Sequence, residues 1–202
     1  MITIVNYGIG NLGSLLNMFK RIAVRATIES NPVVIRQAEK LVLPGVGAFD
    51  GAMTCIDSVS GLREVLNHKV LVEQTPILGV CLGMQLLTCF SEEGKLPGLG
   101  WIPGSTSRFP KQEGLNVPHM GWNVALPNIP SRLTAQVDSE PRYYFVHSYC
   151  VHVDDPSHSL MKTHYGIEFD SAIGHNNIYG VQFHPEKSHR YGMQLFQNFA
   201  AL

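Results

Sequence analysis

Three short, almost continuously apolar runs place the strongest constraint on how this chain can fold. They are ITIVNY at 2–7, KLVLPG at 40–45 and PILGVC at 76–81. A strand that faces water on one side alternates apolar and polar residues, whereas a continuously apolar strand is typical of a parallel sheet covered by helices on both faces. The runs therefore predict an α/β fold with a mostly parallel central sheet flanked by helices.

Segments with helical periodicity separate these runs. Asn11 is a good capping residue for a helix whose apolar residues recur near a 3.6-residue period. A second helix is expected from about 61 to 74, and a third from Leu82. The apolar positions of the first helix are Leu12, Leu15, Leu16, Phe19 and Ile22.

The sequence pattern changes after Glu92. Segments 92–104, 118–130 and 143–153 combine short apolar stretches with Gly, Pro and Asn turns, which predicts short strands added in antiparallel fashion. A last strand in YGVQFHP leads into a closing helix near 189–200. We find no repeat and no linker composition, so we expect one domain spanning 1–202.

Bulk composition argues against several classes of partner. The formal net charge is −1, which gives no electrostatic reason to bind nucleic acid or an anionic membrane surface. No apolar stretch approaches the roughly 18–20 residues that span a bilayer, and the N-terminus does not resemble a secretory signal. The four cysteines lie far apart without CxxC pairs, which argues against a zinc site or a disulfide framework. We expect a reduced, cytoplasmic protein without a metal.

A glycine-rich hexapeptide near the N-terminus offers one functional hypothesis. Residues 8–13 match G-x-G-x-x-G directly after an expected strand, and Glu29 lies where a ribose-binding acid would follow. A dinucleotide-binding protein built on Gly8–Gly13 is therefore an alternative. The simpler interpretation is a tight strand-to-helix turn that needs flexible backbone.

Cys81 offers a second hypothesis, because it lies between Gly79 and Gly83 where the third apolar run ends. The pattern G-x-C-x-G is the cysteine counterpart of the G-x-S-x-G nucleophile elbow, a sharp turn that lifts the nucleophile above the strand. A helix N-terminus directly after it lowers a thiol pKa. The alternative is a buried structural cysteine, which is common in protein cores.

His184 and Glu186 supply a candidate base and a residue to orient it. They lie two residues apart at the end of the last expected strand, so an extended backbone would direct both side chains to the same side. Pro185 stiffens the link between them. Together with Cys81 they have the composition of a catalytic triad. Spacing alone leaves this set and a structural cysteine equally open.

The motifs GVCLGMQ at 79–85 and GVQFHPEKS at 180–188, with PGVGAF at 44–49, resemble the class I glutamine amidotransferase family. The resemblance covers nearly the whole chain. It implies that Cys81 forms a γ-glutamyl thioester, with His184 and Glu186 completing the triad and no metal or organic cofactor. It also implies an oxyanion site at the backbone N–H groups of Val46 and Leu82. The residues implied to contact glutamine are Gly45, Gly47, Gln85, Ser148 and Tyr149.

Further segments resemble one subgroup of that family, the glutaminase subunits of imidazole glycerol phosphate synthases. These segments are NYGIGNLGS, LPGVGAFDGAM, GLGWIPG, VPHMGWN, YYFVHSY and HPEKS. The resemblance implies L-glutamine as substrate and a heterodimer with a (β/α)8 cyclase subunit that receives the ammonia in histidine biosynthesis. A paralogous subunit that feeds another synthase, for example in surface-sugar amidination, is the alternative. The implied interface residues are Asn11, Trp122, Asn123 and Lys187.

Overall fold

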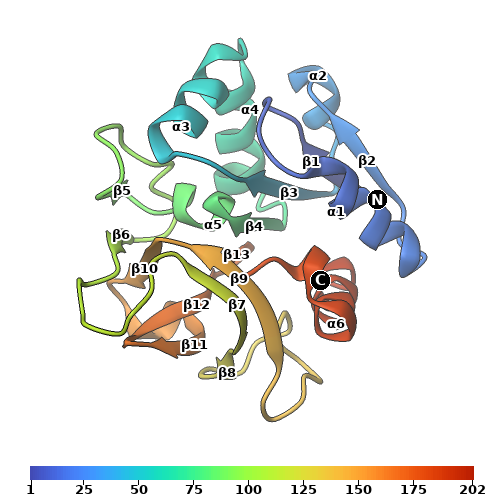
Figure 1. Ribbon diagram of the computed structural model, residues 1–202. Coiled ribbons are helices and arrows are strands. Elements are labelled where there is room, and N and C mark those ends of the chain that lie inside the picture. The colour runs from blue at the N-terminus through green and yellow to red at the C-terminus, as the bar shows by residue number, and fades with distance from the viewer.

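An eleven-stranded mixed sheet runs through the computed structural model, which describes all 202 residues (Figure 1). Its parallel part holds, in spatial order, β2 (Ala26–Glu29), β1 (Ile2–Val5), β3 (Lys40–Gly45), β4 (Ile77–Cys81) and β13 (Ile178–Val181). The sheet continues through β12 (Ile167–His175), β10 (Tyr149–Val153), β6 (Gly104–Arg108) and β5 (Phe90–Ser91). β11 (Ser159–Tyr165) pairs with β12 and β8 (Leu126–Pro127), and β7 (His119–Val124) pairs with β9 (Arg142–His147) in a separate sheet.

The three apolar runs of the sequence form β1, β3 and β4, which are neighbours in the sheet. Their side chains enter two cores in alternation. Val42 and Leu78 join one core, whereas Leu43 and Ile77 join the other. Burial on both faces explains why these strands are apolar without interruption. The prediction of an α/β fold with a mostly parallel sheet and antiparallel additions is confirmed.

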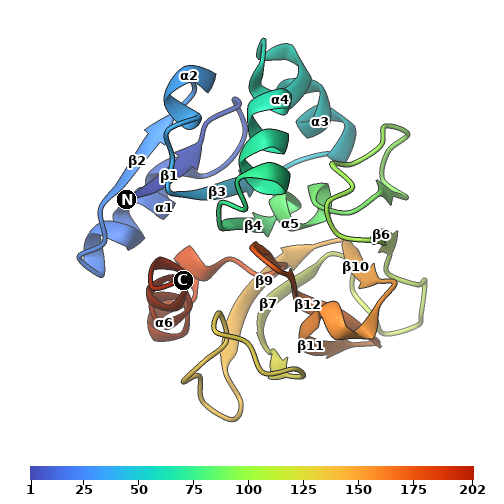
Figure 2. The same cartoon turned by 180° about the vertical axis from the view of Figure 1, so that it is seen from behind.

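Helices cover both faces of the parallel strands. α1 (Leu12–Arg21) and α6 (His189–Ala200) pack on one face, where the Phe19 and Phe196 ring centroids lie 4.5 Å apart. α3 (Phe49–Ser58), α4 (Leu62–Asn67) and α5 (Leu82–Leu86) pack on the opposite face, as the two ribbon views show (Figures 1 and 2). The shorter helical segments are α2 (Pro32–Ile35), η1 (His68–Val72), η2 (Pro156–His158) and η3 (Pro185–Lys187).

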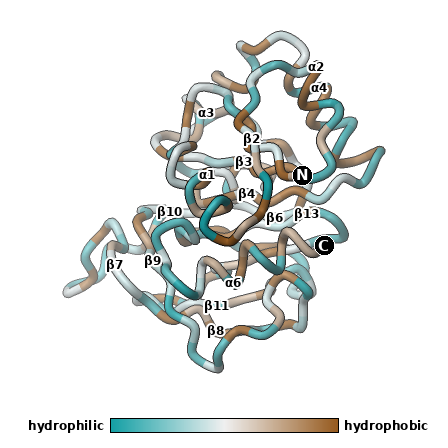
Figure 3. Tube along the Cα trace, turned by 90° about the vertical axis from the view of Figure 1, so that its right-hand side faces the viewer, coloured by the Kyte–Doolittle hydropathy of each residue, from teal (hydrophilic) through white to brown (hydrophobic).

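Apolar and polar segments alternate along the chain in both strands and helices (Figure 3). None of the helices combines the length and the apolar character needed to cross a bilayer. Asn11 caps α1 as expected, because its side chain accepts a hydrogen bond from the Ser14 N–H at 3.4 Å. The helix expected from 61 to 74 is α4 followed by the π-helical turn η1.

Segment 92–103 contains no strand, so the prediction of strands there is wrong. Its backbone groups bond outside any sheet ladder. The Asp50 carboxylate accepts from the N–H groups of Lys95 and Leu96, and the Leu99 N–H donates to the Leu86 carbonyl at the end of α5. The segment is therefore a loop fastened to α3 and α5. The elements that were not predicted from the sequence include α3, β11 and β12.

The glycine-rich hexapeptide forms the turn between β1 and α1. Gly8 and Gly10 have φ values of +93° and +123°, which side chains of L-residues rarely adopt. A Cβ on Gly10 would also lie 2.9 Å from the Pro44 Cβ. Backbone geometry thus accounts for two of the three glycines without any ligand.

Glycines of a second group allow β3, β4 and α5 to approach closely around Cys81. A Cβ on Gly79 would lie 2.5 Å from the Gly83 carbonyl oxygen, and one on Gly45 would lie 2.6 Å from the Gly83 nitrogen. A Cβ on Gly83 would lie 1.9 Å from the Leu43 carbonyl oxygen. The nearest neighbour of each added Cβ would be a backbone atom, so a change of side-chain rotamer could not relieve the overlap.

We expect Gly83→Ala to lower the free energy of unfolding by at least about 2 kcal/mol, because the added methyl group overlaps the β3 backbone. Gly51→Ala is a matched control, since Gly51 lies in α3 and a Cβ added there would meet no atom within 4 Å. Alanine there should be neutral or stabilising by roughly 0.5–1 kcal/mol. Urea unfolding measures both. Equal stabilities of the two variants would contradict the close packing.

Candidate active site

Cys81 is the last residue of β4 and the N-cap of α5, and its backbone is strained. Its φ and ψ values are 56° and −112°, outside the regions that L-residues normally populate. Such a conformation costs on the order of 1–3 kcal/mol and persists only where the surrounding structure holds it. The residue is 6% exposed and lines a cavity of about 360 Å³. The geometry is that of a nucleophile elbow.

His184 and Glu186 are in direct contact beyond the end of β13. The His184 Nδ1 and Glu186 Oε1 atoms lie 2.8 Å apart, and both side chains are almost fully buried. The contact does not arise from an extended backbone, and that expectation is wrong. His184 itself is extended, but Pro185–Lys187 form a 3₁₀ turn that brings the carboxylate back to the ring.

The sheet brings His184 to Cys81. β13 lies parallel and next to β4, with Val181 opposite Val80, so the two chain segments leave the sheet side by side. Burial opposes the charged form of His184, but the nearby Cys81 sulfur and the hydrogen-bonded Glu186 carboxylate outweigh it and raise the pKa of His184 well above its ordinary value. The site thus favours an imidazolium between sulfur and carboxylate.

Most of the residues implied by the resemblance meet in the cavity at Cys81. Of the catalytic, oxyanion and glutamine-contact residues, two do not line it: Gly45 packs behind it against Leu82 and Gly83, and Glu186 lies behind His184. No three His, Cys, Asp or Glu side chains are grouped as ligands of a metal ion would be. The implied residues that do line the cavity are Val46, Gly47, Cys81, Leu82, Gln85, Ser148, Tyr149, His184 and Lys187.

Two buried glutamines lie beside the thiol, and one of them was not predicted from the sequence. The Gln182 Nε2 lies 3.8 Å from Cys81 Sγ, and the Gln182 Oε1 accepts from the Gln85 Nε2 at 3.1 Å. Gln85 Nε2 also donates to the Tyr149 carbonyl at 3.2 Å. Both of its hydrogens are therefore used, which leaves Gln85 Oε1 as a free acceptor at the cavity. The position of Gln182 two residues before His184 was the available signal.

Glu93 is a second residue that was not predicted from the sequence. It lines the cavity, and its Oε2 accepts a hydrogen bond from the Phe49 N–H at 2.9 Å. This bond fixes the carboxylate at the start of α3. The residue lies in the loop 92–103, where no motif marks it. Glu93 brings negative charge to one side of the cavity, opposite in sign to the exposed Lys187 on its lining.

The remaining implied residues lie outside the cavity. Trp122 is 47% exposed and stacks on the His189 ring at a centroid distance of 5.4 Å. Trp122 and Lys187 both contact the Tyr144 ring, so they share one surface beside the triad. Asn11 is exposed at the start of α1. Asn123 is half-buried, and its amide is bonded within the fold.

Two buried histidines are cross-strand partners in the β7–β9 sheet; His147 lines the cavity, whereas His119 does not. His119 lies opposite His147, and the His119 Nδ1 and His147 Nε2 atoms are 3.1 Å apart. Burial lowers the pKa of His119 to about 4. Burial, with smaller contributions from nearby groups, lowers the pKa of His147 to about 3. Both rings are therefore neutral at pH 7.

Comparison with known proteins places these features in a family context. The family model of class I glutamine amidotransferases matches residues 3–201. The chain is 46% identical to the imidazole glycerol phosphate synthase subunit HisH 2 of Pseudomonas aeruginosa, over 100% of both chains. It is 50% identical to the subunit of the same name in Methanococcus maripaludis, over 98% of both. It is 44% identical to the HisH subunit of Bdellovibrio bacteriovorus, over 100% of both.

Solved structures show the same fold at lower sequence identity. A crystal structure of a glutamine amidotransferase matches with a TM-score of 0.76 at 14% identity, covering 100% of this chain and 99% of that one. The structure of PurLQS from Thermotoga maritima matches with a TM-score of 0.74 at 15% identity, covering 98% and 96%. These matches concern the fold alone.

We expect the free energy of unfolding to fall as the pH decreases below about 6.5. Unfolded histidines bind protons there, whereas His119 and His147 stay neutral in the folded state until about pH 4 and pH 3. Each adds a slope of up to about 1.4 kcal/mol per pH unit. Urea unfolding at pH 7, 6 and 5 measures the slope. The double variant His119→Asn, His147→Asn is the control, and an unchanged slope in it would contradict this assignment.

Proposed function

This chain belongs to the class I glutamine amidotransferase family and, within it, to the HisH subunits of imidazole glycerol phosphate synthase, and we propose that Cys81, His184 and Glu186 are its catalytic triad. The observation that carries the proposal is the strained Cys81 elbow beside the His184–Glu186 contact of 2.8 Å. The reaction is hydrolysis of L-glutamine to glutamate and ammonia.

In the first step, the Cys81 sulfur attacks the side-chain amide carbon of glutamine. The carbonyl π electrons move to oxygen, and the resulting tetrahedral intermediate collapses when the C–N bond breaks. His184 gives its proton to the departing nitrogen, so that ammonia leaves and a γ-glutamyl thioester remains. The raised pKa of His184 supports this role, because the ring holds the proton that the leaving group needs.

The oxyanion of this intermediate needs hydrogen-bond donors that are already in place. We assign them to the backbone N–H groups of Leu82 and Val46, which both belong to residues lining the cavity. Leu82 begins α5, whose N–H groups at this end have no partner within the helix. Val46 is 43% exposed and precedes Gly47, whose φ is +93°. A reorientation of this loop is the step that aims the Val46 N–H.

Water completes the cycle. His184, left neutral by the first step, accepts a proton from water as the water oxygen attacks the thioester carbon. The C–S bond then breaks, which releases glutamate and restores the Cys81 sulfur beside the imidazolium. Glu186 is a positioning residue that holds the ring and favours the imidazolium. Its second carboxylate oxygen is buried without a hydrogen-bond partner, which keeps its negative charge directed at the ring.

The polar ends of glutamine meet complementary groups in the cavity. We assign the α-ammonium group to the Glu93 carboxylate and to Gln85 Oε1. The carboxylate of Glu93 also accepts a hydrogen bond from the Phe49 N–H. We assign the carboxylate to backbone groups of Gly47, Ser148 and Tyr149. Gly45, buried behind the cavity, serves the substrate only by keeping the loop close to α5.

Ammonia passes to a synthase partner, which we propose is a (β/α)8 cyclase subunit that forms a heterodimer with this chain in histidine biosynthesis. Its products are imidazole glycerol phosphate and aminoimidazole carboxamide ribotide. Exposed apolar side chains support a docking face on β7 and β8: Met120 is 62% exposed and Leu126 51%. We assign Trp122 and Lys187 to the same face and Asn11, exposed at the start of α1, to the interface as well. Asn123 supports it from within.

Replacement of the triad should abolish glutamine hydrolysis and leave the fold intact. We expect Cys81→Ala to be inactive and His184→Ala to lose about 10³-fold or more, because triad members act as a unit. Ammonia release by the chain mixed with its cyclase measures the effect. Cys55→Ala is the control, since that thiol lies in α3 outside the cavity. Retained activity in pure Cys81→Ala would refute the assignment.

The partner should activate the reaction. Loss of one oxyanion donor costs about 10²–10³ in rate, so an isolated chain whose Val46 N–H points away should be a poor glutaminase. We expect activity to rise by at least about two orders of magnitude from the isolated chain to the complex with cyclase and its nucleotide ligand. Full activity of the isolated chain would contradict this activation through the Val46 loop, but it would leave the triad assignment unaffected. Activation by another synthase instead would favour the paralogous function.

A further inference from the structure

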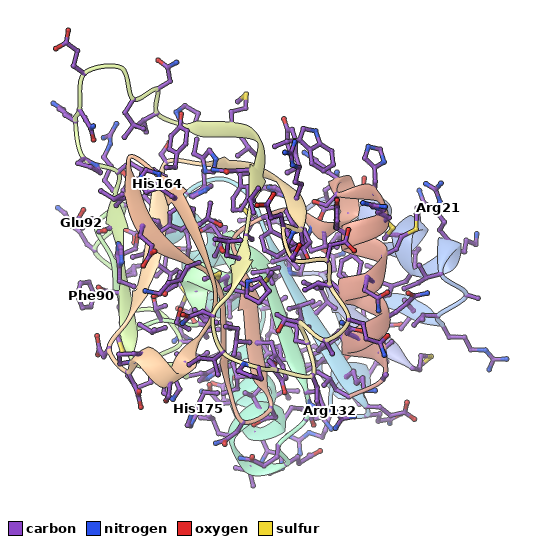
Figure 4. The ribbon with its side chains drawn as sticks, turned by 90° about the horizontal axis from the view of Figure 1, so that it is seen from below. Arg21, Phe90, Glu92, Arg132, His164 and His175 are labelled. Carbon is purple, nitrogen blue, oxygen red and sulfur yellow. The ribbon has the colours of Figure 1, made fainter.

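A chain of hydrogen bonds connects the docking strand β7 to the cavity. The Asn123 Nδ2 lies 3.2 Å from His119 Nε2, and His119 Nδ1 lies 3.1 Å from His147 Nε2. His147 Nδ1 in turn lies 2.7 Å from the Tyr149 carbonyl oxygen. Asn123 also donates to the carbonyl of His164, whose exposed side chain is labelled in Figure 4. None of these imidazoles belongs to the triad.

The direction of each hydrogen bond follows from the last acceptor in the series, the Tyr149 carbonyl. A carbonyl oxygen only accepts, so His147 Nδ1 carries the hydrogen and His147 Nε2 is an acceptor. His119 Nδ1 must then donate to it, which makes His119 Nε2 the acceptor for the Asn123 amide. Every ring nitrogen is paired when both histidines are neutral, and the lowered pKa values of both rings agree with this state.

His147 and Tyr149 both line the cavity, and the Tyr149 carbonyl connects His147 to Gln85. It accepts from His147 Nδ1 and from Gln85 Nε2 at 3.2 Å. The second hydrogen of that Gln85 amide is bonded to Gln182 Oε1. With its amino group held at two points, the Gln85 side chain has one orientation, in which its own oxygen is the free acceptor at the cavity.

We propose that His147 is a positioning residue for glutamine: its Nδ1–H holds the Tyr149 carbonyl, which holds Gln85 with its amide oxygen available to the substrate. This inference rests on the proposed function, because it assigns that oxygen to the α-ammonium group of glutamine. His119 and Asn123 fix the tautomer of His147 on which the donor depends.

Two substitutions of His147 separate the two ring nitrogens. Asparagine places an amide near the position of Nδ1, so His147→Asn keeps a donor toward the Tyr149 carbonyl and loses the bond to His119. Glutamine places its amide near the position of Nε2, so His147→Gln keeps contact with His119 and loses the donor. Glutamine is closer to histidine in size, so a purely structural role for His147 favours His147→Gln.

The first readout is chemical modification of Cys81 and needs no partner. A glutamine analogue that alkylates the thiol, 6-diazo-5-oxo-L-norleucine, depends on the glutamine site, whereas iodoacetamide does not. We expect His147→Gln to react about tenfold more slowly than the wild type with the analogue and at the wild-type rate with iodoacetamide. This factor corresponds to about 1.4 kcal/mol, within the range of one hydrogen bond. His147→Asn should stay within about twofold for both reagents.

The second readout is glutaminase kinetics in the complex with the cyclase. His147→Gln should raise the KM for glutamine about tenfold with little change in kcat, because the lost contact serves binding. Equal effects of His147→Asn and His147→Gln, or a larger effect of His147→Asn, would overturn the inference. A wild-type protein that neither hydrolyses glutamine nor reacts with the analogue at Cys81 would instead refute the proposed function.

A second pair of variants covers the case in which His147→Gln does not fold, as judged by thermal unfolding. His119→Asn keeps a donor toward His147 Nε2, whereas His119→Leu removes it and frees the His147 tautomer. We expect His119→Leu to slow the reaction with the analogue about threefold relative to His119→Asn, at equal iodoacetamide rates. Equal rates with the analogue would overturn the inference.

Discussion

The close contact between backbones around Gly83 is the constraint on which the site depends. Cys81 holds a φ of 56° without being glycine, and nothing in its own side chain stabilises that conformation. The turn persists because Gly83 fits against the β3 carbonyl of Leu43 and because Gly79 and Gly45 leave room for α5. Packing energy of the surrounding sheet therefore offsets the strain. The same contact sets the positions of the thiol, the helix N-terminus and the loop at Val46 relative to one another.

Local patterns were enough to predict the parallel core. A continuously apolar strand and a glycine beside a close backbone contact each leave a mark within a few residues, as in 40–45 and in Gly79-Val80-Cys81. The proximity of His184 and Glu186 was also predictable, although the turn between them was not. Gln182 had only its position before His184 as a signal, because its bond to Cys81 joins residues about a hundred positions apart. The tautomer of His147 could not be predicted, because it depends on His119 on the neighbouring strand.

The missed elements have a related cause. α3 begins after Ala48, which offers no capping side chain, and contains Gly51, so neither propensity nor a start signal marks it. The loop 92–103 carries the glycines and prolines of a strand-and-turn pattern, yet Asp50 and the end of α5 satisfy its backbone groups. Both departures place Glu93 at the cavity, since its carboxylate bonds the first residue of α3. The loop is thus part of the site rather than a connection between strands.

The position of β13 has a consequence for how the protein is made. The strand lies between β4 and β12 in the middle of the sheet, yet it follows every other strand in the sequence. While a ribosome is still elongating the polypeptide, the thiol of Cys81 exists without its base, and β4 and β12 have open edges. Open edges pair with other chains, so this interval exposes the nascent protein to aggregation. In return, a nascent polypeptide that still lacks β13 cannot consume glutamine, because insertion of β13 closes the sheet and delivers His184.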